Sequence, residues 1–250
     1  SQDFWYSAVN TLGGTITKFP LSRVGAFGGN LICAGSWNVA GGSEEWVGGG
    51  IGNDLAVFVM SSGDTIVYEG DNPASNWNLV GVYRIPDPLD IRAITKVGGD
   101  LVIATKGGII SMAAVSSAGQ LEDKGVISDK INPALIEKNS LSDPGWQLEY
   151  HPTYSQGRLL LLNIPNSTLD FDQYVMNADT LSWARFKDIV SRSWGRFDDG
   201  LYFGTTDGKI MKFDDGNADV AADINGDAET AYSYFDARGV LKRCAALRPV

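Results

Sequence analysis

The chain has 250 residues, of which 44% are hydrophobic and 30 are glycine, and its formal net charge is −10. This composition is typical of globular proteins with many turns and excludes an intrinsically disordered chain. The negative charge argues against nucleic-acid binding as the main task of this segment. No apolar run approaches the roughly 18 residues of a membrane-spanning helix, and the first residues lack the pattern of a secretory signal.

The first predicted strand covers residues 15–19, after a turn at Gly13-Gly14, and a second, buried strand covers 31–34. Residues 41–52 read GGSEEWVGGGIG, which is too rich in glycine for regular structure. This loop is not a P-loop, because no Gly-Lys-Ser/Thr follows and it leads into a strand rather than a helix.

Residues 54–85 form the most complete unit of strands. We predict strands at 55–60, 65–69 and 77–85, the last of which ends against the two prolines of 86–88. The next unit contains residues 98–114, GGDLVIATKGGIISMAA, where two apolar runs flank a glycine turn and so predict a β-hairpin.

Residues 115–145 interrupt this pattern. Ser128 and Asn132 are candidate caps for one short helical insertion near residues 128–141, with Pro133 in its first turn. A fourth unit is predicted to follow, with strands at 147–151, 158–164, 172–176 and 181–186. A fifth begins at Ser193 and includes a second hairpin, 199–211, and residues 228–250 predict a terminal hairpin.

The units repeat at a nearly constant interval. The aligned residues Leu55, Leu101, Leu159 and Leu201 are separated by 46, 58 and 42 positions, and removing the fourteen residues 128–141 reduces the middle interval to 44. A period of about 40–45 with four strands per unit is typical of a β-propeller blade. We therefore predict an all-β fold: a β-propeller of about five four-stranded blades, or part of a larger propeller.

This propeller is predicted to be a single domain over residues 1–250, with two packed β-sandwiches as the alternative fold. The terminal hairpin, 228–250, would close the ring or lead into a following domain. Because the chain starts without Met and ends inside a predicted strand, we expect it to be a segment of a longer protein.

Three aspartates form the most tempting catalytic set, because five-bladed propellers include glycosidases that use carboxylates. Asp54 and Asp100 directly precede aligned leucines, and Asp199 lies two positions before another. Residues that repeat in phase with a fold usually serve it, for example by accepting hydrogen bonds from turn amides. We assign these aspartates to turns, and no catalytic residue is predicted.

His151 is the only histidine, and the chain contains no Gly-x-Ser-x-Gly nucleophile elbow with which it would act. We expect a satisfied histidine at the surface or at a sheet edge. Clusters of zinc ligands are absent from the sequence, and we predict no cofactor. Cys33 and Cys244 both lie in apolar contexts that indicate buried free thiols, with a disulfide between them as the minor alternative.

The acidic stretch 214–227 contains Asp223, Asn225 and Asp227 at alternate positions, as in calcium-binding loops. Its glycine is at the fourth position rather than the sixth, and Tyr234 replaces the usual twelfth-position glutamate. A solvated loop is therefore the preferred interpretation. Among the seven tryptophans, Trp37 and Trp46 are the two that we expect to be exposed.

Ten short stretches, distributed over nearly the whole chain, together resemble a family of phage and prophage structural proteins. They are NDLAVF (53–58), YEGDNP (68–73), WNLVGVYRI (77–85), GGDLVIAT (98–105), ISDKI (127–131), GWQL (145–148), YVMN (174–177), LYFG (201–204), DGK (207–209) and RPV (248–250). By a weaker analogy, the chain is similar to propeller-bearing hub, nozzle or DNA-stabilisation proteins of short phage tails. The family supplies no catalytic residues.

The resemblance implies a non-enzymatic component of a tailed-phage virion, in the tail or the head–tail assembly. It implies contacts with other virion proteins and copies of the chain arranged in a ring. The negative charge predicts that this segment binds no nucleic acid. Two alternatives stay open: a carbohydrate-binding or glycan-degrading propeller that recognises a host-surface glycan, and a bacterial sensor or scaffold propeller.

Overall fold

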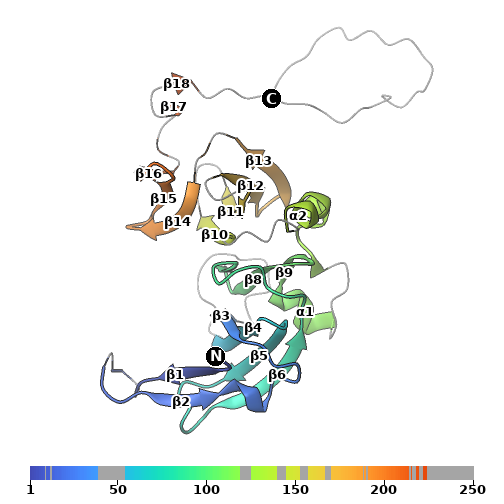
Figure 1. Cartoon of the computed structure of the whole chain (residues 1–250), viewed down its shortest axis with the longest axis vertical. Helices are drawn as coiled ribbons and strands as arrows, with labels where there is room; N and C mark the ends of the chain where they lie inside the picture. Colours follow the sequence, from blue (N-terminus) through green and yellow to red (C-terminus); the bar gives the residue numbers. More distant parts are fainter. Residues whose placement is uncertain are drawn as a thin grey trace, which may run out of the picture. The chain divides into compact units, whose positions relative to one another are not determined.

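The computed structural model describes residues 1–8, 10–11, 13–38, 54–118, 125–139, 145–152, 157–166, 170–187, 189, 191–213, 215, 218–219 and 222–223. The chain divides into two compact units, Ser1–Phe213 and Asp214–Val250. The first unit consists mainly of small antiparallel sheets (Figure 1), which confirms the prediction of a mostly β protein. None of the described helices is long and apolar enough to span a membrane.

Two sheets are four-stranded, and in both the strands follow one another in chain order. The first contains β3 (Leu31–Asn38), β4 (Asp54–Met60), β5 (Asp64–Glu69) and β6 (Asn78–Arg84). The second contains β10 (Gln147–Pro152), β11 (Arg158–Pro165), β12 (Phe171–Asn177) and β13 (Ser182–Phe186). These bounds agree closely with the predicted strands, because each strand is a branched or aromatic run that ends at glycine, proline or polar turn residues.

Two further sheets are three-stranded. One consists of β7 (Ile94–Val97), β8 (Asp100–Thr105) and β9 (Gly108–Ser111), and the other of β14 (Ser191–Phe197), β15 (Gly200–Thr205) and β16 (Ile210–Lys212). The predicted hairpins are thus β8–β9 and β15–β16. Two-stranded sheets are formed by β1 (Asp3–Tyr6) with β2 (Thr17–Pro20), and by β17 (Ala218–Asp219) with β18 (Ala222–Asp223) in the second unit.

Glycine is required at the β8–β9 turn. Gly108 has a φ of +121°, and a Cβ there would lie 2.7 Å from the Asn132 Oδ1 atom and 2.8 Å from the Ser128 Oγ atom. A side chain at this position would be strained by the backbone and would also clash with the segment that packs on the hairpin.

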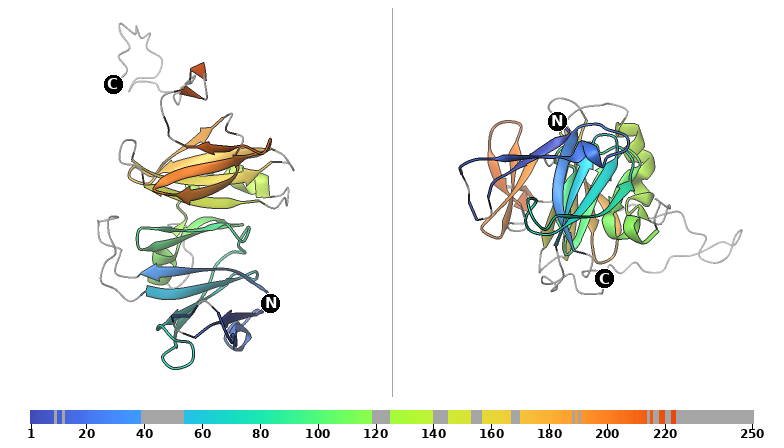
Figure 2. Two further views of the ribbon diagram at one scale, coloured as in Figure 1. Left: turned by 90° about the vertical axis from the view of Figure 1, so that its left-hand side faces the viewer. Right: turned by 90° about the horizontal axis from the view of Figure 1, so that it is seen from below.

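Successive sheets of the first unit pack face to face through apolar clusters (Figure 2). Val57 and Val67 of the β3–β6 sheet meet Ile103 and Ile110 of the β7–β9 sheet in one cluster. The next cluster joins β7–β9 to β10–β13, and a third joins β10–β13 to β14–β16. The first strands of these sheets contact one another in chain order: β3 with β7, β7 with β10, and β10 with β14.

The helical insertion predicted near 128–141 is confirmed as η4 (Asp129–Ile131) and α2 (Asn132–Asn139), but Ser128 caps neither. Its Oγ atom accepts a hydrogen bond from the Ile109 amide (2.8 Å) and so holds the insertion against β9. A second helix, α1 (Met112–Ala118), was not predicted. A one-turn 3-10 helix, η1 (Leu21–Arg23), follows β2.

Candidate interaction surfaces

Side-chain amides hold the last two sheets of the first unit together. The Gln147 Nε2 atom donates to the Trp194 carbonyl at 2.9 Å, and the Gln147 Oε1 atom accepts from the Trp194 amide at 2.9 Å. The Gln173 Nε2 atom donates to the Asn163 Oδ1 atom (2.8 Å) and to the Ser191 carbonyl (3.3 Å). All these residues are buried. Because buried polar groups are costly without partners, these bonds fix one arrangement of the two sheets.

Hydrogen bonds also join the earlier sheets near their first strands. The Leu148 amide donates to the Arg92 carbonyl (3.0 Å), and the Asn38 amide donates to the Gly99 carbonyl (2.8 Å). The Lys96 Nζ atom donates to the Ser36 Oγ atom at 3.0 Å. The sheets of Ser1–Phe213 are therefore joined by directional bonds as well as by apolar contact, which favours a rigid body.

The three aspartates predicted to serve turns occupy three different structural positions. Asp100 accepts hydrogen bonds from the amides of Leu101 (2.8 Å) and Ala113 (3.0 Å) and from the Ser111 hydroxyl. It thus fixes the start of both β8 and α1, although burial raises its pKa. Asp199 lies in the β14–β15 turn with a left-handed φ of 59°. The turn position is confirmed for Asp199, whereas Asp100 is the first residue of β8 and bonds to the start of α1.

Asp54 differs from the other two aspartates, because its carboxylate is 63% exposed and lies 3.5 Å from the Lys96 Nζ atom on a neighbouring sheet. It bridges two sheets at the surface instead of serving a turn. The repeat in the sequence gives no indication of this, since Lys96 is 42 positions further along the chain.

His151 lies on β10, an edge strand, as predicted, but its ring is only 7% exposed. The reason is Phe213, whose ring contacts the imidazole edge to face at a centroid distance of 6.1 Å. Phe213 follows β16 and reaches His151 only through the packing of two sheets. The expected surface position is therefore wrong, and the edge position is confirmed.

Cys33 is buried, as predicted, and loss of hydration raises the pKa of its thiol to about 12, so that it stays protonated. Trp37 is 2% exposed, and the prediction that it is exposed is wrong, because its indole packs in the cluster between the first two sheets. Cys244 and Trp46 lie outside the described residues. So does the predicted hairpin 228–250.

The calcium hypothesis is only partly covered by the structure. Asp223 ends β18, whereas Asn225 and Asp227 lie outside the described residues. The part of the chain that the structure describes holds no group of three or more residues suited to a metal ion. The interpretation of 214–227 as a solvated loop is wrong for residues 218–219 and 222–223, which pair as β17 and β18, and stays a prediction for the rest.

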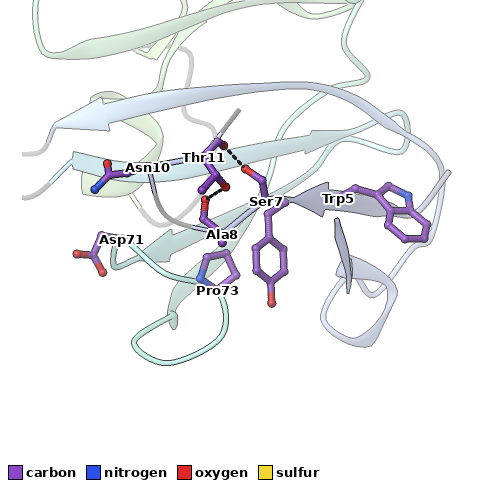
Figure 3. A pocket seen from close by; sticks show the side chains of 8 residues that line it. Trp5, Ser7, Ala8, Asn10, Thr11, Asp71 and Pro73 are labelled. Atoms are coloured by element: carbon purple, nitrogen blue, oxygen red, sulfur yellow. Dashed lines mark hydrogen bonds between the residues drawn. The ribbon is translucent and has the colours of Figure 1, made fainter. Parts of the chain in front are cut away.

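An open hollow of about 710 Å³ lies between the chain after β1 and the loop that precedes β6 (Figure 3). Asn10 and Asp71 line one end of it, and Trp5 lies at the other end. The indole of Trp5 is 58% exposed. The hollow therefore combines an aromatic face with amide and carboxylate groups.

The outer strand of the first sheet presents an apolar surface. Leu79, Val80 and Val82 of β6 are 47%, 46% and 40% exposed. Among the described residues, no strand pairs with the outer edge of β6. The sequence contains a signal for this surface, because residues 79–83 carry no charge.

Comparison of the chain with protein-family models and with curated proteins found no match. The molecule combines packed sheets, polar bonds between those sheets, and two exposed surfaces. These features suit a rigid body that binds other molecules through its surface.

Proposed function

We propose that this chain is a non-enzymatic structural component of a tailed-phage virion, in the tail or the head–tail assembly. We further propose that its sheets are the blades of a β-propeller, either complete or part of a larger ring. Its partners would be other virion proteins and further copies of the chain. The family resemblance supports the virion role, and the sheet architecture supports the propeller.

The observation that carries the proposal is the order of contacts between first strands. In a propeller, each blade runs from an inner to an outer strand, and successive blades meet near the axis. Here β3, β7, β10 and β14 each begin a sheet and contact one another in that order. Two packed sandwiches would instead divide these sheets into two separate pairs.

Such a body would act as a stiff spacer and docking platform. The polar bonds between sheets, such as those of Gln147 with Trp194, would resist sliding of one sheet past another. Loops and outer strands would then provide the contacts to neighbouring proteins. No step of this mechanism needs a catalytic group.

Purified particles test the virion role. Particles from a host that carries the gene, banded on a density gradient, should contain the chain at a fixed copy number by quantitative mass spectrometry. Gold-labelled antibody against the chain should mark one site on the particle. Particles that assemble and infect normally when the gene is deleted, and that lack the chain, would refute this role.

Cryo-electron microscopy of the full-length protein tests the architecture separately. We expect the sheets to be related by a pseudo-rotation about one axis. Sheets arranged as two sandwiches would reject the propeller without affecting the virion proposal.

A carbohydrate-binding role is the second candidate, and the hollow with Trp5, Asn10 and Asp71 favours it. Sugar rings bind to exposed indoles while carboxylates and amides bind their hydroxyls. A glycan array with the wild type and Trp5→Ala tests binding, and a reducing-sugar assay tests hydrolysis. Hydrolysis abolished by Asp54→Asn or Asp199→Asn would overturn the non-enzymatic proposal.

A further inference from the structure

One wall of the hollow beside β1 is a turn that its own hydrogen bonds hold in shape (Figure 3). The Ser7 Oγ atom donates to the Thr11 carbonyl at 2.8 Å, and the Thr11 hydroxyl donates to the Ala8 carbonyl at 2.7 Å. Asn10 has a left-handed φ of 61°, a conformation that asparagine tolerates better than most residues. This wall is therefore formed by the chain itself, without a ligand.

The other wall is the loop 71–76, which is held in the same way. The Asn72 Oδ1 atom accepts a hydrogen bond from the Ala74 amide at 2.9 Å. Both walls are anchored in one aromatic cluster, because Phe4 of β1 and Trp77, directly after the loop, have ring centroids 6.4 Å apart. Since both walls are preorganised, binding costs little free energy for ordering the site.

The lining mixes aromatic and polar groups and carries little charge. Trp5, which is 58% exposed, lies at one end, and Asn10 and Asp71 line the other (Figure 3). Asp71 is the only charged residue among the described residues that line the hollow. Lys18, opposite Trp5 on β2, is paired with Asp3 at 2.9 Å. The described lining thus offers an indole face and hydrogen-bond acceptors, but no cation that would bind a phosphate, sulfate or carboxylate group.

We infer that this hollow binds an uncharged oligosaccharide of at least two sugar rings. The C–H groups of one ring pack on the Trp5 indole, and hydroxyls of another ring donate to the Asp71 carboxylate and exchange hydrogen bonds with the Asn10 amide. This binding mode deepens the carbohydrate-binding role proposed above and rests on it, whereas it does not depend on the virion role.

The size and layout of the hollow favour such a chain over a small cation. Its volume of about 710 Å³ falls within the roughly 300–1,000 Å³ of sites for drug-sized ligands, which are larger than a single sugar ring. A cation that binds to an indole lies within about 6 Å of the ring centroid, so its carboxylate partner must be close to the ring as well. Trp5 and Asp71 instead lie at opposite ends (Figure 3), which suits an extended molecule with apolar C–H faces and many hydroxyls.

A glycan array followed by isothermal titration calorimetry tests the class of ligand. The array presents neutral, acidic and amino-sugar glycans of one to four rings to the 250-residue chain. Neutral glycans of two or more rings should bind, and the corresponding monosaccharides should bind at least about tenfold more weakly. Absence of binding to every glycan would refute the carbohydrate-binding role together with this inference. A preference for acidic or amino sugars, or equal affinity for monosaccharides and longer chains, would overturn the inference alone.

Variants of the lining test the site, with the neutral oligosaccharide that the array binds most strongly as the probe. Trp5→Ala should weaken binding at least about tenfold, and Asp71→Asn at least about threefold. Asn10→Gly removes the amide while it tolerates the left-handed backbone, and should also weaken binding at least about threefold. Thermal unfolding of each variant verifies that it is folded.

Two matched controls lie outside the hollow. Phe197→Ala removes an aromatic ring that is 76% exposed on β14, and Asp129→Asn neutralises an exposed carboxylate in η4. Both should leave the affinity unchanged. If Trp5→Ala or Asp71→Asn binds the probe like the wild type, the glycan binds elsewhere. That result would overturn this inference and leave the carbohydrate-binding role intact.

Discussion

The two four-stranded sheets have the same strand order and a tryptophan in or just before the last strand, but their outer parts are covered in different ways. Trp77 precedes β6, and Trp183 lies on β13. On the first sheet, the β1–β2 hairpin contributes Phe4 and Phe19 to an aromatic cluster that contains Trp77. The Phe4 and Phe58 rings stack with centroids 4.6 Å apart.

The second sheet is covered by the insertion 125–139, which packs on it through Leu135, Ile127 and Ile131 and adds several polar contacts. The Trp183 Nε1 atom donates to the Ile127 carbonyl at 3.1 Å. Asp172 of β12 pairs with Arg185 and, at 3.1 Å, with Lys138 of α2. The carboxylate of Asp172 is only 8% exposed.

This difference shows how a repeated fold becomes specialised. The two four-stranded sheets have similar strands and similar apolar packing against their neighbours. The segments that cover their outer parts lie outside these strands and differ between the two sheets. An aromatic cover depends on burial, whereas an ionic cover depends on charge and therefore on salt. Substitutions in the two covers should consequently respond differently to ionic strength.

The largest effect is expected from Phe58→Ala in the aromatic cluster. Phe58 is 7% exposed and its ring contacts those of Phe4, Tyr68 and Trp77. Its removal leaves a large cavity and should lower the free energy of unfolding by about 3–5 kcal/mol. Urea denaturation measures the loss, which should be the same in low salt and in 1 M NaCl. A loss below about 1 kcal/mol would show that the hairpin does not cover this face in solution.

Asp172→Ala should have a smaller effect that depends on salt. It removes both ion pairs and leaves Lys138, whose side chain is 23% exposed, without its carboxylate. Because Arg185 is 48% exposed and screened, we expect a loss of about 1–3 kcal/mol rather than the full cost of a buried pair. The loss should shrink in 1 M NaCl. A loss equal at both salt concentrations would contradict an ionic cover.

The strands of both sheets could be predicted from the sequence because their signals are local. Alternation, glycine turns and the prolines after residue 85 lie within each unit. The covers could not be predicted in the same way. α1 reads MAAVSSA, a weak pattern for a helix, and part of its support comes from Asp100, more than ten residues earlier in the chain.

The exposure of side chains at the candidate surfaces could not be predicted from the sequence either. Trp37 and His151 are buried because neighbouring sheets pack against them. Leu79 and Val82 are exposed because no such neighbour covers them among the described residues. A single strand carries no information about what lies beyond it. Patterns in sequence therefore identified the sheets but not their exposed edges.

Replacing Trp77 and Trp183 in turn by phenylalanine measures what the hydrogen bond of the Trp183 indole contributes to stability. Trp183→Phe loses the 3.1 Å bond to the Ile127 carbonyl, whereas the buried Nε1 atom of Trp77 has no hydrogen-bond partner among the described residues. Both variants lose similar apolar area. Trp183→Phe should therefore cost about 1 kcal/mol more than Trp77→Phe in the free energy of unfolding. Equal costs in urea denaturation would show that the indole bond contributes nothing.

The smallest effect concerns the first strands of the two sheets. β3 carries no carboxylate, whereas β10 carries Glu149, whose pKa is raised by burial and only partly lowered by Arg196. With a raised pKa, the folded state binds the proton more tightly than the unfolded state. The resulting stabilisation is complete below the ordinary pKa of 4.5 and is lost as pH rises through the raised value.

Glu149→Gln removes this titration, so its melting temperature should be slightly above that of the wild type at pH 7. The gain should disappear at pH 4, where Glu149 of the wild type is protonated when folded. Asp71→Asn, which changes an exposed carboxylate, is the control for general charge effects. If Glu149→Gln instead lowers the melting temperature at pH 7, attraction to Arg196 outweighs the cost of burial. The Glu149–Arg196 pair would then be a further polar bond between β10 and β14, alongside that of Gln147 with Trp194.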